Sequence, residues 1–177
     1  MKRRLPALAA GILLLAIHVG SLRAQEVRDD VTETIETFRA GDSGMASWFN
    51  GAYGYAVFPN VGKGGFIVGA GHGTGQVFKG DELIGKAEIS MLSVGLQIGG
   101  QSYSEVIFFE NAEVLQRLID SKLEFGAAVS AVALTSGASA DASYRNGVAV
   151  FTRAKGGAMA EASMSGQKFD YTAYEDR

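Results

Sequence analysis

Three basic residues beside glycines are the groups of this chain whose types and spacing best fit a binding task. Lys63 stands in a glycine-rich stretch, and Arg153 and Lys155 stand two positions apart just before Gly156-Gly157. Residues two apart on a strand project from the same face. Paired cations next to glycine N–H groups can hold a phosphate. The alternative is ordinary surface charge, since most lysines and arginines are exposed.

The glycine-rich stretch, GKGGFIVGAGHGTGQVFKG from Gly62 to Gly80, does not complete a nucleotide-binding motif. A P-loop ending at Gly62-Lys63 needs glycine at position 57 and Ser or Thr at position 64, where Val57 and Gly64 stand. The glycines at positions 69, 71, 73 and 75 never form G-x-G-x-x-G, because Thr74 and Gln76 occupy the third-glycine positions. The sequence therefore gives no nucleotide site.

Nucleophilic catalysis and metal binding have weak support. Ser43 or Ser165 with His72, the one histidine outside the first 24 residues, could form a hydrolase pair, but neither serine stands in a complete motif. With no cysteine and one such histidine, only carboxylates could bind a metal. The acidic residues at helical spacing, Asp29, Asp30, Glu33 and Glu36, are interpreted as a solvated helix face. We predict no catalytic residue, no metal and no cofactor.

Residues 1–24 have the pattern of a secretory signal peptide. Basic residues at positions 2–4 precede an apolar run, Leu8 to Val19, that is too short to span a membrane, and an imperfect cleavage site ends at Ala24. We predict cleavage and a periplasmic or secreted protein; an uncleaved N-terminal anchor is the alternative. Without a cysteine the chain has no lipoprotein attachment site.

Removal of residues 1–24 leaves 12 basic against 19 acidic residues, a formal charge of −7 in place of −3. A chain of this charge is not steered to nucleic acid as a whole, so an anionic partner must meet a local basic patch. The remaining length fits one domain.

The positioning elements begin with helices. Apolar residues recur at helical spacing from Glu26 to Arg39, within an N-terminal segment 25–42. Asp42 or Ser43 is expected to cap a second short helix that carries Met45, Trp48 and Phe49. Asn111 is expected to cap a third helix, which includes Leu115 and Leu118.

The rest of the chain alternates with a period of two. We expect a strand from Tyr53 stopped by Pro59, a hairpin with its tip at His72-Gly73, and a strand that includes Leu92 to Ile98. We also expect a strand buried on both faces at Val106–Phe109, an alternating segment from Leu123 to Leu134, and a type I′ hairpin at Asn146-Gly147. The expected fold is α+β: a strongly curved antiparallel sheet or barrel of about eight to nine short strands.

Four stretches together resemble one known family. They are GYAVFPNVGKGGFIV from Gly54, the glycine run that continues to Gly75, SVGLQIGG from Ser93, and FTRAKG from Phe151. In this order, from about Ser43 to the C-terminus, they are similar to the SYLF lipid-binding domain, also called Ysc84-like, and to its exported bacterial branch.

The resemblance implies a non-enzymatic lipid-binding domain at residues 43–177. Eukaryotic members bind phosphoinositides and some bind actin, but an exported bacterial protein is not expected to meet actin. The family pattern implies basic residues at Lys63, Arg153 and Lys155, the predicted lipid-binding residues. We therefore expect a cell-envelope protein that binds anionic phospholipid or a membrane surface. The alternative is a structural or protein-interaction module of the envelope, and a hydrolase ranks last.

Overall fold

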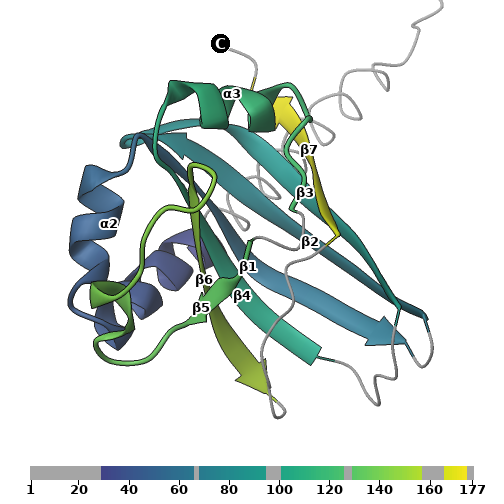
Figure 1. Cartoon of the computed structure of the whole chain (residues 1–177), viewed down its shortest axis with the longest axis horizontal. Helices are drawn as coiled ribbons and strands as arrows, with labels where there is room; N and C mark the ends of the chain where they lie inside the picture. Colours follow the sequence, from purple (N-terminus) through teal and green to yellow (C-terminus); the bar gives the residue numbers. More distant parts are fainter. Residues whose placement is uncertain (1–28, 66–67, 95–100, 126–128, 157–165, 175–177) are drawn as a thin grey trace, which may run out of the picture.

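The computed structural model describes residues 29–65, 68–94, 101–125, 129–156 and 166–174; the predicted signal peptide lies outside them. A seven-stranded sheet in the order β5-β6-β4-β1-β2-β3-β7 forms its centre (Figure 1). The strands are β1 (Gly54–Gly65), β2 (Val68–Lys79), β3 (Glu82–Val94), β4 (Gln101–Phe109), β5 (Ala131–Ala133), β6 (Val148–Gly156) and β7 (Gln167–Ala173).

The sheet is curled but open. Every neighbouring pair is antiparallel except β5 and β6, which run parallel. A side-chain hydrogen bond joins Gln167 of β7 to Glu105 of β4, although three strands separate β4 from β7 in the sheet. The α+β class is therefore confirmed. The strand count of eight to nine and the barrel are wrong for the described residues, because β5 and β7 are edges and the Leu123–Leu134 segment supplies only three strand residues.

The strand β4 is buried on both of its faces and contributes to both hydrophobic clusters. Its apolar run from Val106 to Phe109 is fully buried and alternates between two clusters, as expected for a strand covered on both sides. The inner-face cluster lies in the concavity and includes Phe58, Ile89, Ile107, Phe109, Leu118, Phe125 and Phe169. The helix-face cluster lies on the other side and includes Val31, Phe38, Met45, Phe49, Val57, Phe108 and Phe151.

The helix face is covered by the N-terminal helix, described over residues 29–41, and by α2 (Met45–Gly51) (Figure 1). The expected cap of α2 is wrong: Gly44 is the N-cap and carries no side-chain cap. Asp42 instead accepts hydrogen bonds from the N–H of Gly44 at 2.9 Å and of Ser139 at 2.7 Å. These bonds lower the pKa of Asp42. Asp42 thus ties the interhelical turn to the 3₁₀ helix η1 (Ala138–Ala140).

The two locally encoded features of the C-terminal half are confirmed. Asn111 caps α3 (Ala112–Ile119) by accepting from the N–H of Val114 at 3.2 Å. Asn146 and Gly147 both have positive φ, 53° and 79°, inside a bridge between Arg145 and Val148. That conformation is the type I′ turn that Asn-Gly favours.

Two expectations for β1 and β2 are wrong. Pro59 does not stop its strand, because β1 continues to Gly65 through a register shift at Val57–Asn60, and a bulge is where a strand tolerates proline. His72 is no turn: it is an exposed residue in the middle of β2, paired with Gly62. The β1–β2 pairing instead extends as far as Gly65 and Gly69.

Glycines along β2 leave room for large inner-face side chains. A Cβ on Gly75 would lie 2.6 Å from the Phe58 ring, and one on Gly71 would lie 2.5 Å from Met91. Both distances are too short for a contact between two non-bonded carbon atoms, so a side chain at either position would clash. These bare positions therefore admit close neighbours, which are side chains of β1 and β3.

Candidate functional site

A polar groove of about 430 Å³ lies between the N-terminal helix and the sheet. Its lining residues come from three strands and the helix: Asp30, Glu33, Thr34, Thr37, Pro59, Asn60, Ser104, Arg153, Ala154 and Lys155. The volume falls within the range of about 300–1,000 Å³ that is typical of small-molecule sites.

The floor of the groove is formed where the β1 bulge meets β4. The Ser104 hydroxyl, which is buried, donates to the Pro59 carbonyl at 2.9 Å. The Ser102 hydroxyl donates to the Asn60 side-chain oxygen at 2.7 Å. These bonds hold the bulge that carries Pro59 and Asn60 into the groove.

Arg153 and Lys155 line one wall, and both are exposed. Arg153 pairs with Ser104, and Ala154 with Tyr103, but the next pair joins Gly156 to Ser102. The register shift leaves Lys155 as the extra residue of a bulge. The prediction that these two cations share a face is supported by their common groove, although a bulge contributes to their placement.

Lys63 lies at the same end of the sheet. Gly62 pairs with Ser102, which also pairs with Gly156, and Lys63 itself pairs with Gln101. Strands lie about 4.8 Å apart, so the backbone of β1 at Lys63 is about 10 Å from the end of β6. The Lys63 side chain is not among those the structure describes. The fold thus brings the three predicted residues to one end of three adjacent strands.

Asp30 and Glu33, interpreted from the sequence as part of a solvated helix face, also form the opposite wall of the groove. Both are exposed, and with Thr34 and Thr37 they follow the i, i+3, i+4, i+7 spacing of one helix side. Among the described residues no ion pair connects this wall with Arg153 or Lys155. The two walls therefore carry opposite charges across an open space.

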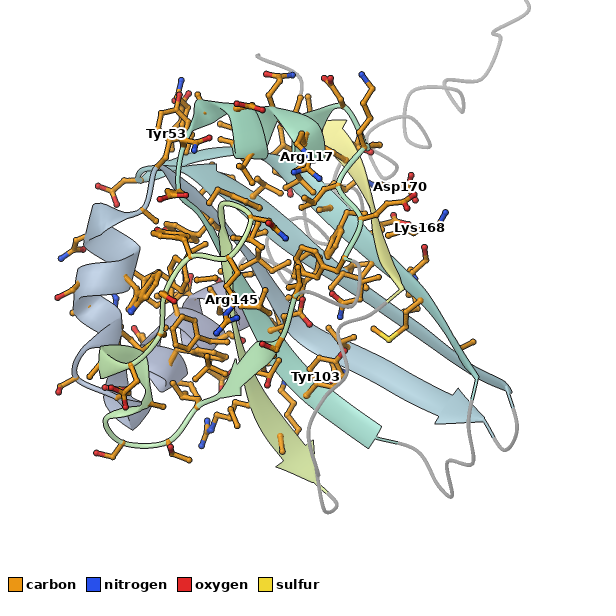
Figure 2. The ribbon with its side chains drawn as sticks, viewed as in Figure 1. Tyr53, Tyr103, Arg117, Arg145, Lys168 and Asp170 are labelled. Carbon is orange, nitrogen blue, oxygen red and sulfur yellow. The ribbon has the colours of Figure 1, made fainter. Side chains whose placement is uncertain are left out.

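A second polar group lies in the inner face, and it was not among the residues predicted from the sequence. Glu105 is fully buried, and its Oε2 accepts from the Gln167 side-chain amide at 3.0 Å. The same amide lies 3.4 Å from the hydroxyl of Tyr103, which points into the concavity (Figure 2). Glu105 Oε1 has no hydrogen-bond partner among the described residues. Burial raises the pKa of Glu105 to about 7, and the Gln167 bond opposes that rise.

The residues of the hydrolase hypothesis do not form a site in the part of the chain that is described. Ser43 is exposed in the turn before α2, His72 is exposed within β2, and no described hydrogen bond joins them. Ser165 lies outside the described residues. No described helix has the length and hydropathy to cross a bilayer.

Residues 90–176 match the model of the Ysc84 family, described as "Las17-binding protein actin regulator". Over these residues the chain belongs to the Ysc84 family, the SYLF family. A similar curated protein is "Beta cell expansion factor A" of Aeromonas veronii, 31% identical over 124 residues. The match covers 68% of this chain but 46% of that relative, so the chain spans less than half of the relative's length.

Membership in the SYLF family confirms the recognition made from the four sequence stretches. The family is a non-enzymatic binding family known for lipid and actin binding. The family match includes β4, β6 and β7, and therefore one wall of the groove, with Arg153 and Lys155. The acidic wall belongs to residues N-terminal of that match.

Proposed function

We propose that this SYLF protein is a non-enzymatic lipid-binding protein of the bacterial cell envelope, and that Arg153 and Lys155 hold the phosphate of a phospholipid. One observation carries the proposal: both cations line a groove of ligand size at the end of the sheet where β1 brings Lys63. Membership in a family known for lipid binding supports it.

The chemistry of the wall suits phosphate. Arginine offers a planar fork of donors to phosphate oxygens, and lysine adds a mobile point charge. The residues around the groove are mostly polar, so it fits a headgroup, and acyl chains would remain in the membrane. Considered alone, the cations favour an anionic phospholipid, which is the partner predicted from the sequence.

The predicted export of the chain limits the partners that it can meet. A periplasmic or secreted protein meets bilayer surfaces of the envelope, which supports a membrane partner and not actin. Export itself is part of the proposal, because residues 1–24 lie outside the described structure.

Co-sedimentation with phospholipid vesicles tests the proposal. Vesicles of phosphatidylglycerol and phosphatidylethanolamine should pellet the protein at low salt and release it as salt rises, because exposed charges are screened. Lys63→Glu should weaken binding, whereas Lys86→Glu, at an exposed β3 residue outside the groove, should have a smaller effect. A protein that stays in the supernatant at every salt concentration contradicts the proposal. Capture of a stoichiometric envelope protein would then favour the interaction-module alternative.

A further inference from the structure

The groove has two charged walls, and their charges balance. Asp30 and Glu33 supply two carboxylates, and Arg153 and Lys155 supply two cations. No ion pair within the described chain joins the walls, so neither pair of charges neutralises the other by direct contact. The space between them, about 430 Å³, leaves both available to a ligand.

This balance weakens the preference for a purely anionic ligand. Charges interact over about 8 Å at physiological ionic strength, so an anion in the groove is attracted by one wall and repelled by the other. A ligand with separated charges gains from both, since its phosphate can face the cations and its ammonium the carboxylates.

We infer that the groove takes a phosphate ester that also carries a primary ammonium group, the zwitterionic phosphoethanolamine headgroup, because a carboxylate wall faces a cationic wall across it. This inference rests on the proposed function, since it keeps the phosphate on Arg153 and Lys155 and specifies what else the headgroup carries. The same chemistry occurs in phosphatidylethanolamine and in free phosphoethanolamine.

The type of ammonium matters as well. A primary ammonium has three N–H donors for Asp30, Glu33 and the Thr37 hydroxyl, whereas the trimethylammonium of phosphocholine has none. The groove should therefore rank phosphoethanolamine above phosphocholine. Glycerol 3-phosphate, which has no cation, should bind more weakly than phosphoethanolamine.

Calorimetric titration of the purified protein with these three soluble compounds is the first test. We expect phosphoethanolamine to bind at least about fivefold more tightly than glycerol 3-phosphate. The double variant Asp30→Asn, Glu33→Gln should abolish that preference and leave glycerol 3-phosphate bound equally or more tightly. Glu36→Gln, an exposed acid of the same helix outside the groove lining, is the matched control and should keep the preference.

Vesicles separate the two sources of the headgroup. Equimolar phosphatidylethanolamine and phosphatidylcholine should bind the protein more tightly than phosphatidylcholine alone, and the double variant should lose this difference. Binding of free phosphoethanolamine without binding to any vesicle would support the zwitterion but contradict the lipid function.

Two further outcomes distinguish failure of the inference from failure of the proposed function. The inference is overturned if phosphoethanolamine and glycerol 3-phosphate bind with equal affinity and the double variant leaves both affinities unchanged. If vesicle binding is intact in that case, the proposed function stands. No binding of any compound or vesicle overturns both.

Discussion

Ser104 and Glu105 are neighbours on β4, yet they belong to two different polar regions. Ser104 points toward the N-terminal helix and forms part of the floor of an open groove with charges on both walls. Glu105 points into the concavity, where Gln167 bonds one carboxylate oxygen and apolar side chains surround the rest. One step along a strand thus separates a region open to ligands from one that is closed.

The two regions differ in whether a ligand can reach their charged groups. Charges at the groove are exposed, so they can bind a ligand but contribute little to stability. The carboxyl of Glu105 is desolvated, so it affects stability and pH dependence strongly but has no described cavity in which to meet a ligand. Changes in the interior should therefore alter folding, and changes in the groove should alter binding.

The largest effect is expected from the interior at Gln167. Gln167→Leu removes the described hydrogen-bond donor to Glu105, and a buried carboxylate without a partner costs about 3–5 kcal/mol of unfolding free energy at pH 8. Urea unfolding measures this. Lys168→Ala, next to it on β7, is the control: Lys168 projects outward (Figure 2), and its exposed ion pair with Glu124 is worth under about 1 kcal/mol. Equal losses for the two variants would contradict the account of the interior.

The second effect is a pH dependence of stability that Glu105 imposes. Its pKa is about 7 when folded, against an ordinary 4.5, so the folded state holds a proton that the unfolded state releases. Stability is therefore highest below about pH 4.5 as far as this group is concerned, falls as the pH rises, and is lower by about 3 kcal/mol above pH 7.

Glu105→Gln should remove this loss between pH 5 and pH 8. Its unfolding free energy, followed by urea titration at several pH values, should exceed that of the original protein at pH 8 and match it more closely at pH 5. Glu88→Gln, the same substitution at an exposed β3 residue, should leave the pH profile unchanged. If the unfolding free energy of Glu105→Gln depended on pH as steeply as that of the original protein, another group would cause the pH dependence.

The third effect belongs to the groove. Arg153→Glu with Lys155→Glu should weaken binding to phosphatidylglycerol–phosphatidylethanolamine vesicles by about 2 kcal/mol, roughly 30-fold, since each basic residue near a membrane contributes about 1 kcal/mol. The urea midpoint should hardly change, because both residues are exposed. Glu105→Gln should do the reverse, with altered stability and unchanged binding. If both variants lost binding equally, the two regions would not be separate.

The smallest effect is expected at the boundary between the regions. Ser104→Ala removes a hydrogen bond of 2.9 Å to the Pro59 carbonyl, which costs about 1 kcal/mol. The loss should be the same at pH 5 and pH 8, because serine does not titrate in this range. Thermal unfolding at both pH values measures it, and a loss that varied with pH would couple Ser104 to Glu105.

Features set by local sequence were predicted correctly. The Asn111 cap and the Asn146-Gly147 turn depend on side-chain and backbone preferences within a few residues, so they could be read without the fold. The errors arose where distant pairing decides. Pro59 is tolerated because β1 is bulged there, and His72 lies within a strand because β2 pairs with β1 and β3 along its length.

The residues of the groove also divide into those that a local pattern predicts and those that only the fold brings together. Period two on a strand grouped Arg153 with Lys155, but their place in one groove also depends on the bulge at Lys155, which no local pattern predicts. No local pattern could show that Asp30 and Glu33 face them, since this depends on how the N-terminal helix docks on the sheet. Glu105 did leave a signal: it alternates with Tyr103, Ile107 and Phe109, and this parity places its carboxyl on the core face.

The most direct test of the central claim, that a phospholipid occupies the groove, uses the absence of cysteine in the chain. Thr37→Cys places a unique thiol in the groove lining, and Glu113→Cys places one on α3, beside a different groove. The measurement is the rate of alkylation by iodoacetamide with and without phosphatidylglycerol–phosphatidylethanolamine vesicles. We predict that the vesicles slow alkylation at position 37 severalfold and leave the rate at position 113 unchanged. Equal rates at position 37 with and without vesicles, in a sample that co-sediments with them, would contradict the claim.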